Sequence, residues 1–294
     1  MSRQLIIPKA PAVIKRLMLQ PLSILAMEIP LIPCACTIAG SDPSGGAGIQ
    51  SDIKTFSALG VWGLSVITAV TSQNAKIVRG SWNVPEDAIR LQLVTLLEDF
   101  EIKAYKTGML PDRGAVAAVV GGIPEGIPLV VDPVMVSSSG SPLMDPEGLS
   151  ELIEKLIPRA TLVTPNLPEA EVLSGYGPIK SVDEMRSAGR SILKEGPAYV
   201  LVKGGHLPDS SGLVPDLLIG HEREWVFTGE HQPFGAHGTG CCLSAAITGH
   251  LALGKDVPAA CAAAKEFVGR AIGTSFTTNC GNRIVNPGYT GIMK

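Results

Sequence analysis

Residues 33–70, PCACTIAGSDPSGGAGIQSDIKTFSALGVWGLSVITAV, contain the pattern that decides the fold. The stretch Pro33–Gly40 is short and apolar, which is typical of a buried strand. Ala47–Leu59 then repeats apolar residues at helical spacing, and Gly60 ends this helix. Gly63–Val70 is strand-like again. A helix between two buried strands predicts a unit in which the strands run parallel.

The same alternation continues along the chain. Helices are predicted at Pro85–Phe100, Asp112–Val120, Pro146–Leu156, Pro168–Leu173, Val182–Leu193, Thr239–Leu253 and Val257–Ile272. Strands are predicted at Ala104–Thr107, Leu129–Val131, Thr161–Thr164 and Tyr199–Val202, followed by a hairpin of Asp216–Ile219 and Glu224–Phe227. This order predicts an α/β fold with a central, mostly parallel sheet that helices cover on both faces. Residues 27–294 are expected to form a single domain, because no repeat or linker interrupts them.

Composition limits the classes of protein to which the chain can belong. Of its 294 residues, 45% are hydrophobic, which is enough to bury a full core and excludes global disorder. The net charge is −3 and aromatic residues make up 4%, so a basic nucleic-acid surface and base-stacking platforms are poorly supplied. No apolar run has the length of a membrane span. The six cysteines show no C-x-x-C spacing, so we expect a reduced, cytoplasmic protein without nucleic-acid or membrane partners.

Residues 1–26 differ in composition from the rest of the chain. They carry four basic residues and no acidic one, as a transit peptide does. They contain only two serines, however, and three prolines break any long amphipathic helix. We therefore favour a disordered N-terminal extension, or a functional start at Met27, over an organellar transit peptide.

In sheets of this kind the ligand binds beyond the carboxyl ends of the strands. Polar and glycine-rich segments follow the predicted strands at Gly40–Gly48, Ser72–Asn74, Lys106–Met109, Asp132–Met135, Thr164–Glu169, Lys203–His206 and His237–Cys241. The sequence lacks the motifs G-x-x-x-x-G-K-[ST], G-x-G-x-x-G, G-x-S-x-G and H-E-x-x-H, which argues against P-loop, Rossmann, hydrolase and zinc-protease sites. The clustering predicts an active site at one edge of the sheet.

The segment Gly238-Thr239-Gly240-Cys241 opens a predicted helix. Glycines let backbone N–H groups approach a ligand closely, and a helix N-terminus favours an anion, which suits a transferring phosphoryl group. The alternative is a glycine-rich turn before a packed helix. At a helix N-terminus the pKa of the Cys241 thiol is expected to be lowered, which would let it act as a base towards a substrate hydroxyl. A buried, inert cysteine is the alternative for Cys241, and Cys242 is expected to be a packing residue.

Four further residues suit a site for phosphate and Mg²⁺. Asp132 ends a β-branched strand, and Asn166 and Glu169 lie three residues apart at a helix start. Mg²⁺ keeps several waters and takes one or two carboxylates, so this supply is sufficient. The alternative for Asn166 and Glu169 is a helix N-cap with a capping box. Lys203, at the end of an apolar strand, is placed to neutralise phosphate charge, or is a solvated lysine.

Together these motifs resemble one family. The segments TIAGSDPSGGAGIQSDIKTFSALGVWGLSVITAVTSQN (residues 37–74), KTGML, VVDPVM, TPNLPEA, VKGGHL and HGTGC are similar, in the same order, to those of the hydroxymethylpyrimidine and phosphomethylpyrimidine kinases of thiamine biosynthesis. The resemblance runs from about Cys36 to about Lys265. It implies a three-layer α/β/α, ribokinase-like fold in a homodimer. It also implies phosphorylation of 4-amino-5-hydroxymethyl-2-methylpyrimidine and then of its monophosphate, with ATP and Mg²⁺.

The resemblance implies roles for individual residues. The catalytic cysteine would be Cys241, with an anion hole of Gly238, Thr239 and Gly240. Lys203 would contact the ATP phosphates, and the metal positions would be Asp132, Asn166 and Glu169. The pyrimidine would contact Asp52 and Gln73, in a pocket lined by Gly40, Met109 and Val134. We expect Asp52 and Gln73 to face the same crevice, because Asp52 lies one turn past the Gly45–Gly48 loop and Gln73 follows the next strand.

Two departures from the family pattern stand out. Cys242 occupies a position where threonine is expected, and residues 279–287 only loosely resemble the family's glycine-rich ending. Two other functions stay open: a pyridoxal kinase of the same cysteine-bearing group, and a non-catalytic pyrimidine-binding sensor. Gln73 and Met109 favour the pyrimidine over pyridoxal. The presence of Asn166, Glu169, Lys203 and the Gly238–Cys241 segment argues against the sensor.

Overall fold

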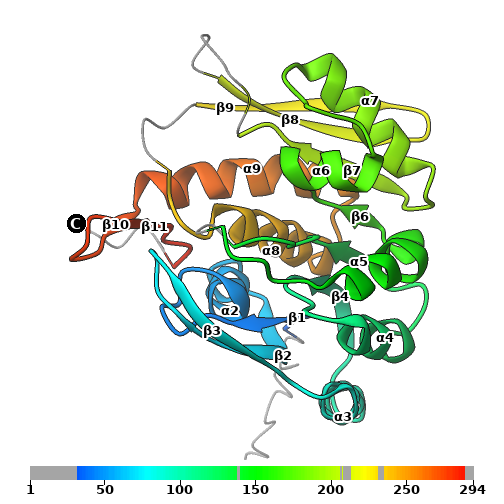
Figure 1. Cartoon of the computed structure of the whole chain (residues 1–294), viewed down its shortest axis with the longest axis vertical. Helices are drawn as coiled ribbons and strands as arrows, with labels where there is room; N and C mark the ends of the chain where they lie inside the picture. The colour runs from blue at the N-terminus through cyan, green and yellow to red at the C-terminus, as the bar shows by residue number, and fades with distance from the viewer. Residues whose placement is uncertain (1–31, 138–139, 206, 208–212, 231–234, 289–294) are drawn as a thin grey trace, which may run out of the picture. The chain divides into compact units, whose positions relative to one another are not determined.

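The computed structural model describes residues 32–137, 140–205, 207, 213–230 and 235–288. From Ile32 onward the described residues form one compact unit around a nine-stranded sheet (Figure 1). In spatial order its strands are β3 (Val78–Asn83), β2 (Trp62–Gln73), β1 (Cys34–Ser41), β4 (Ile102–Thr107), β5 (Leu129–Val131), β6 (Leu162–Val163), β7 (Tyr199–Lys203), β8 (Leu213–Gly220) and β9 (Glu224–Glu230). The strands from β2 to β7 in this order run parallel, and β3, β8 and β9 add antiparallel pairs at the two edges.

The chain reverses its direction of travel across the sheet beside β1. From β1 it moves to β2 on one side, and it later enters β4 on the other side. In open parallel sheets such a reversal leaves a crevice at the carboxyl ends of the two strands that flank it. The topology therefore points to the carboxyl ends of β1 and β4 as the centre of a site.

Helices cover both faces of the sheet, so the three-layer α/β/α fold expected from the sequence is confirmed. One face packs against α2 (Gly48–Ala58), α8 (Thr239–Ala252) and α9 (Val257–Gly273). The other packs against α3 (Glu86–Leu97), α4 (Arg113–Gly122), α5 (Pro146–Glu151), α6 (Leu167–Ser174) and α7 (Val182–Leu193). Successive strand residues alternate between the two cores, as the pleat of a strand requires.

Most helices begin at a residue that suits an N-cap. Asp112, Asp145, Ser181 and Asp256 each accept a hydrogen bond from a backbone N–H in the first turn of α4, α5, α7 or α9. Helix α8 differs, because it starts after Gly238, which has φ 89° and provides no side-chain cap. The first backbone N–H groups of α8 thus have no acceptor on the side chain of their own N-cap residue.

The structure differs from the sequence-based prediction at three places. Strand β3 was not predicted, because VRGSWN has no apolar alternation and forms by pairing with an extended β2 at the sheet edge. The short pair β10 (Phe276–Thr277) and β11 (Arg283–Ile284) was also not predicted. The predicted helix Pro146–Leu156 consists of α5 followed by a wider turn at Leu152–Leu156.

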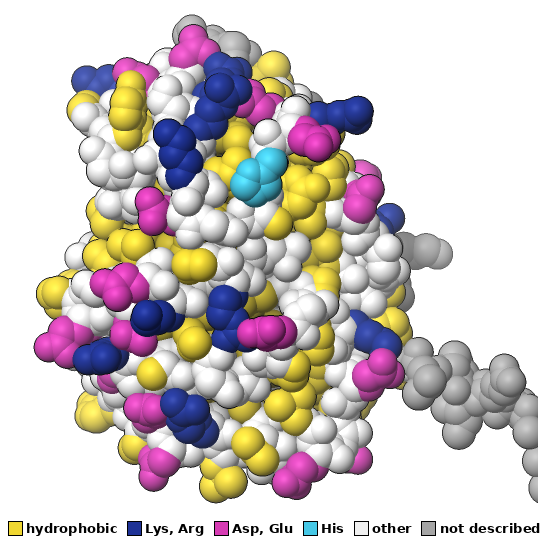
Figure 2. All heavy atoms as spheres, turned by 90° about the vertical axis from the view of Figure 1, so that its right-hand side faces the viewer, with side chains coloured by type: hydrophobic (Ala, Val, Ile, Leu, Met, Phe, Trp, Pro, Cys, Tyr) yellow, Lys and Arg dark blue, Asp and Glu magenta, His cyan; other side chains and the backbone are white. Residues whose placement is uncertain are grey.

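The molecular surface agrees with the balanced composition. On the face drawn in Figure 2, lysine and arginine side chains are interspersed with acidic ones, so this face offers a nucleic-acid backbone no continuous basic surface. Within the described ranges, no helix combines the length and the apolar character needed to cross a membrane.

Candidate active site

The sheet face that packs against α8 changes from apolar to polar along the strands. Near the amino ends of the strands, residues such as Ala35, Ala104 and Val130 belong to the core. The residues two positions further on share the same face and are polar. This edge is lined by Thr37, Lys106, Asp132, Thr164, Lys203 and Asp216, all buried or half-buried. The polar edge coincides with the edge at which the sequence predicted the site.

Three lysine–aspartate pairs lie along this edge. The Nζ atoms of Lys106, Lys203 and Lys265 lie 2.7, 2.9 and 2.6 Å from carboxylate oxygens of Asp52, Asp132 and Asp216. The first pair has no exposed side-chain surface, whereas the side chain of Lys203 is 13% exposed and that of Lys265 is 17% exposed. The edge is therefore sealed near β1 and β4 and accessible near β7, where the sequence predicted contact with ATP.

The start of α8 forms a tight turn over the polar edge. A Cβ on Gly238 would lie 1.7 Å from the carbonyl oxygen of Gly46, so only glycine fits there. A Cβ on Gly240 would lie 3.5 Å from Lys203 Nζ, which places this loop beside the lysine. The first N–H groups of a helix have no acceptor within the helix. The predicted anion hole of Gly238, Thr239 and Gly240 is therefore next to a lysine that can share an anion with it.

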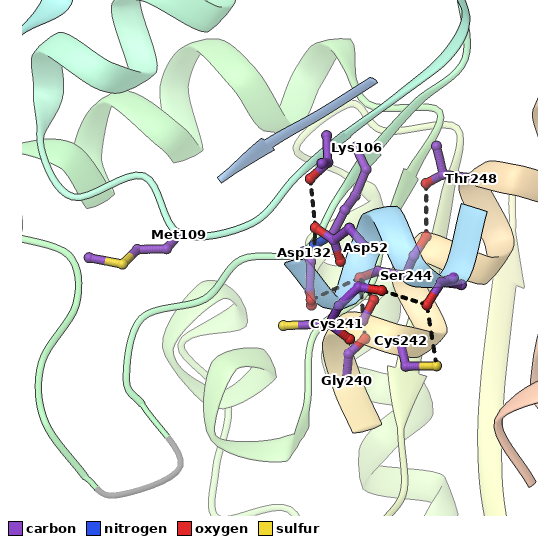
Figure 3. Close-up of polar contacts among 12 residues, drawn as sticks. Asp52, Lys106, Met109, Asp132, Gly240, Cys241, Cys242, Ser244 and Thr248 are labelled. Atoms are coloured by element: carbon purple, nitrogen blue, oxygen red, sulfur yellow. Dashed lines mark hydrogen bonds and ion pairs between the residues drawn. The ribbon is translucent and has the colours of Figure 1, made fainter. Parts of the chain in front are cut away.

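Cys241 occupies the first turn of α8 and is half-buried. Its sulfur projects away from the helix on the side where Met109 lies (Figure 3). Burial raises the pKa of its thiol to about 11; Lys106 opposes the rise, whereas Asp132 and Asp52 add to it. The expectation of a lowered pKa was wrong, because loss of hydration outweighs the helix N-terminus and the nearby lysine. Cys241 is therefore protonated at neutral pH before a ligand binds.

Cys242 has a packing role, as the sequence suggested. It is fully buried, and its sulfur accepts a hydrogen bond of 3.7 Å from the hydroxyl of Thr55 on α2. In Figure 3 its sulfur points away from the sulfur of Cys241. Cys242 thus joins α8 to α2 and does not face the polar edge.

Two of the predicted pocket residues lie against each other. A Cβ on Gly40 would lie 2.8 Å from Met109 Sδ, and Thr68 Oγ1 donates a 2.6 Å hydrogen bond to the Met109 carbonyl. Gly40 lies next to the start of α2, because a Cβ on Gly48 would lie 2.4 Å from the Gly40 carbonyl oxygen. Gly40 and Met109 therefore form one wall where β1 and β4 end.

Gln73 is connected to the same wall. It is the last residue of β2, and its Oε1 accepts a 3.3 Å hydrogen bond from the Thr71 hydroxyl. The same hydroxyl donates a 2.8 Å bond to the carbonyl of Ser41, next to Gly40. Val134 is half-buried and follows Asp132, whose carbonyl accepts its N–H at 2.9 Å.

Asp52 is fully buried beside Lys106 in this structure, and the expected contact of Asp52 with the pyrimidine stays a prediction. Its side chain has no exposed surface, and its Oδ2 accepts hydrogen bonds from Thr37 Oγ1 (2.6 Å) and Lys106 Nζ (2.7 Å). Its Oδ1 is buried without a hydrogen-bond partner. From α2 this carboxylate points towards the sheet, where it contacts Lys106 on β4 and Thr37 on β1.

Asn166 and Glu169 form the capping box that the sequence left as an alternative. The Glu169 N–H donates to Asn166 Oδ1 (2.9 Å), and the Asn166 N–H donates to Glu169 Oε2 (2.8 Å). The side-chain oxygen of Asn166 is therefore already engaged. A metal role for Asn166 stays a prediction, while its structural role is clear.

Asp132 and Glu169 together suit a hydrated cation. Lys203 Nζ lies 2.9 Å from Asp132 Oδ1 and 4.0 Å from Glu169 Oε2, so two carboxylates share one ammonium group. Burial raises the pKa of Glu169 to about 7, with Lys203 opposing and Asp132 adding to this rise. No group of three His, Cys, Asp or Glu residues in the described segments could hold a metal by itself. The donor set fits Mg²⁺, which needs only one or two protein carboxylates when phosphate oxygens complete its shell.

Lys106 lies in a segment that the sequence placed at the site edge, but the sequence analysis gave it no role. It is fully buried, and although burial by itself would lower its pKa, the pairing with Asp52 raises it. A lysine on the core-facing side of a strand is rarely buried without a partner, so the pattern IKAYKT indicated that Lys106 pairs with an acidic residue. Its partner on α2 could not be inferred, because the two residues are 54 positions apart.

Comparison with known proteins identifies relatives along most of the chain. The family model described as phosphomethylpyrimidine kinase matches residues 42–286. The hydroxymethylpyrimidine/phosphomethylpyrimidine kinase of Streptomyces coelicolor is 41% identical over 261 residues, which cover 87% of this chain and 95% of that protein. The thiamine biosynthetic bifunctional enzyme of Arabidopsis thaliana is 42% identical over 259 residues, covering 87% of this chain and 49% of that protein.

Solved structures share the fold. A crystal structure of an ADP complex of Bacillus subtilis pyridoxal kinase superimposes with a TM-score of 0.77 at 37% sequence identity, covering 87% of this chain and 97% of that one. The similarity therefore extends to proteins named as kinases of two different substrates, a pyrimidine and pyridoxal.

Proposed function

The chain belongs to the phosphomethylpyrimidine kinase family, and from this premise we propose that it phosphorylates 4-amino-5-hydroxymethyl-2-methylpyrimidine and then the resulting monophosphate. The family makes the chain a phosphotransferase of thiamine biosynthesis. ATP is the proposed phosphoryl donor, and a neighbouring structure that binds ADP supports it. The homodimer and the cytoplasmic location expected from the sequence stay predictions.

One observation carries the proposal. The half-buried thiol of Cys241 lies at the start of α8; its sulfur projects on the side where Met109 lies, and the preceding residue Gly240 lies beside Lys203. A substrate hydroxyl on the side of Met109 and a phosphate on the side of Lys203 would meet at this thiol and at the N–H groups of the Gly238–Gly240 loop. Such an arrangement brings together the hydroxyl that accepts the phosphoryl group, a base for its proton, and N–H groups that stabilise the developing charge, as phosphoryl transfer requires.

The residues of the chain divide the work. Cys241 can take the proton of the substrate hydroxyl only as a thiolate, so its own proton must first leave to solvent; with a pKa of about 11, the thiolate that remains is a strong base. Lys106 favours that thiolate, and Asp52 holds Lys106 in place. Lys203 and the start of α8 bind the transferring phosphoryl group. Asp132 and Glu169 would hold Mg²⁺, which neutralises phosphate charge when it is bound.

A pyridoxal kinase is the second candidate, because a structure of that name superimposes on the chain. The Gln73 amide favours the pyrimidine, since it can pair with a ring nitrogen and the adjacent exocyclic amine at once. Pyridoxal has no such amine. The pyrimidine should therefore be preferred in kcat/KM by on the order of 10²-fold or more.

The test is ADP release measured with purified protein, ATP and Mg²⁺ and each of three acceptors: the hydroxymethylpyrimidine, its monophosphate and pyridoxal. The proposal expects ADP with the first two and inefficient turnover with pyridoxal. Equal efficiency with pyridoxal would favour the second candidate. Binding of the pyrimidine without ADP release would indicate the non-catalytic sensor.

A further inference from the structure

Two segments that are distant in the sequence pack against the loop at residues 236–240 that opens α8. They are the loop at residues 42–47 after β1 and the segment at residues 283–286 near the end of the chain. We infer that Asp42 and His237, supported by residues 283–286, are positioning residues that hold the Gly238–Gly240 loop in the shape that binds a phosphoryl group. This inference rests on the proposed function only for its kinetic consequence.

The carboxylate of Asp42 organises its own loop and then contacts His237. Its Oδ1 accepts the Ser44 N–H (2.9 Å), and its Oδ2 accepts the Ala47 N–H (2.9 Å) and the Ser44 hydroxyl (3.0 Å). His237 Nε2 lies 3.2 Å from the same Oδ2. The two side chains are only 3% and 8% exposed, so solvent screens this contact weakly. Although burial raises the pKa of Asp42, hydrogen bonds from His237 and Ser44 outweigh it and lower the pKa.

The backbone of His237 is held by the end of the chain. Its N–H donates to the Arg283 carbonyl (2.9 Å), and its carbonyl accepts the Val285 N–H (3.1 Å). Ile284 and Val285 are buried at 5% and 2% exposure. The Asn286 N–H continues this attachment by donating to the Ala271 carbonyl on α9 (3.1 Å). His237 is thus held at its ring by one segment and at its backbone by another.

The contacts leave little room for the loop to move. A Cβ on Gly46 would lie 2.7 Å from His237 Cδ2 and 3.0 Å from Ile284 Cγ2. The next residue after His237 is Gly238, and a Cβ there would lie 1.7 Å from the Gly46 carbonyl oxygen. The Gly238 carbonyl accepts the Cys242 N–H at 2.9 Å, so the turn leads directly into α8. Residues 42–47 and 283–286 therefore approach the loop at residues 236–240 so closely that a Cβ on Gly46 or Gly238 would clash.

The loop needs such support because of its own sequence. HGTG contains two glycines, which leave the backbone many alternative conformations. N–H groups stabilise developing charge only when they are already aimed at it, and a misplacement of about 1 Å can lower a rate by roughly 10²-fold. The sequence motif supplies the N–H groups, and Asp42, His237 and residues 283–286 supply their orientation.

The test compares three histidine variants. His237→Leu removes the contact with Asp42, whereas His237→Gln keeps a donor near the position of Nε2. His250→Leu is the matched control, because His250 lies at the far end of α8 and outside the candidate site. Steady-state kinetics and hydrogen exchange of the peptide covering residues 236–243 are measured for each variant, without ligand in the exchange experiment.

His237→Leu should lower kcat by about 10-fold or more with a much smaller change in the KM of the pyrimidine, as expected for an interaction used mainly in the transition state. Its exchange in residues 236–243 should be faster. His237→Gln should recover most of both properties, and His250→Leu should match the wild type in both. Unchanged exchange and kcat in His237→Leu would overturn the inference, and so would equal losses in His237→Gln and His237→Leu.

A second comparison tests the end of the chain. A chain ending at Gly288 keeps residues 283–286, and a chain ending at Asn282 lacks them. Faster exchange in residues 236–243 is expected only for the shorter chain, and equal exchange in both would remove residues 283–286 from the inference. If the wild type phosphorylates no pyrimidine, the proposed function fails, but the exchange data still decide whether these residues hold the loop.

Discussion

At the scale of single residues, the thiol of Cys241 shows how burial can reverse a local effect. A helix N-terminus and a nearby lysine both favour the thiolate, yet loss of hydration raises the pKa to about 11. With this pKa, Cys241 can act as a base only after its own proton has been lost, so only a small thiolate fraction is competent at neutral pH. The raised pKa also means that the thiol is unreactive at neutral pH, since the thiolate is the nucleophile.

Cys241→Ser should lower kcat by roughly 10²-fold or more, which is the scale of lost acid–base catalysis. Cys242→Ser should change kcat little, because its sulfur contacts Thr55 and does not face the polar edge. Steady-state kinetics of both variants with the hydroxymethylpyrimidine checks this. A crippled Cys242→Ser beside an active Cys241→Ser would show that the base has been assigned to the wrong cysteine.

The pKa of Cys241 predicts a steep pH dependence of its alkylation. Because its thiolate fraction grows as the pH rises towards about 11, iodoacetamide should modify Cys241 about tenfold faster for each pH unit between pH 7 and 10. Peptide-resolved mass spectrometry of the ligand-free protein measures the rate, with the exposed Cys280 as a control for active reagent. A plateau below pH 9 would contradict the raised pKa.

Gln73→Leu tests the residue proposed to recognise the pyrimidine. Leucine cannot pair with the ring nitrogen and the amine, so kcat/KM for the pyrimidine should fall by about 10-fold or more. Activity on pyridoxal should fall less, because pyridoxal lacks the amine. Parallel kinetics with both substrates gives the ratio, and an unchanged ratio would mean that Gln73 does not set specificity.

At the scale of elements, α2, α8 and the sheet meet across buried charges. Lys106 on β4 and Asp52 on α2 form an ion pair with no exposed side-chain surface. Such a pair contributes little net stability, but either charge left alone in the interior is strongly destabilising. The pair therefore makes the packing of α2 on the sheet depend on two residues.

Lys106→Met should lower the free energy of unfolding by about 3–5 kcal/mol, since it leaves Asp52 buried without its partner. Lys103→Met is the matched control on the same strand: its exposed pair with Glu101 should contribute only about 0–1 kcal/mol. Urea denaturation of both variants measures the difference. The double variant Asp52→Asn with Lys106→Met should recover part of the loss, and no recovery would show that packing, not charge, causes it.

At the scale of the whole molecule, the described hydrophobic core is built from residues between Cys34 and Val285. The two parts of this core lie on opposite faces of one sheet, and both reach the edge that carries the candidate site. The chain therefore needs nearly its whole described length to place that edge. Residues near the end of the described chain contribute to this edge as directly as residues near β1.

A chain that starts at Met27 should fold and turn over like the full-length chain. Residues 1–26 carry no core pattern in their sequence, so the Tm should change by less than about 2 °C, corresponding to a fraction of a kcal/mol. Thermal unfolding and ADP release of the two chains check this. A large fall in either would show that residues 1–26 pack against the rest of the protein.

Much of this molecule could be predicted from sequence, because its elements are encoded locally. Apolar residues at helical spacing in Ala47–Leu59 and β-branched runs such as Leu129–Val131 identify helices and strands before any contact is known. The edge strand β3 could not be identified this way, since it is held by pairing with β2 and has almost no core face. The sequence predicted either a metal site or a capping box at Asn166 and Glu169, because both arrangements use the same two residues.

The sequence by itself determined the fold class, and it predicted the site at one edge of the sheet with the segment Gly238–Cys241 at its centre, because motifs at strand ends must meet at one edge. Only the tertiary structure decided the charge state of that edge. Asp52 pairs with Lys106, Asp42 contacts His237, and the thiol of Cys241 stays protonated at neutral pH. The physical reason is that burial and ion pairing depend on which distant residues become neighbours, and the spacing of residues along the chain does not contain that information.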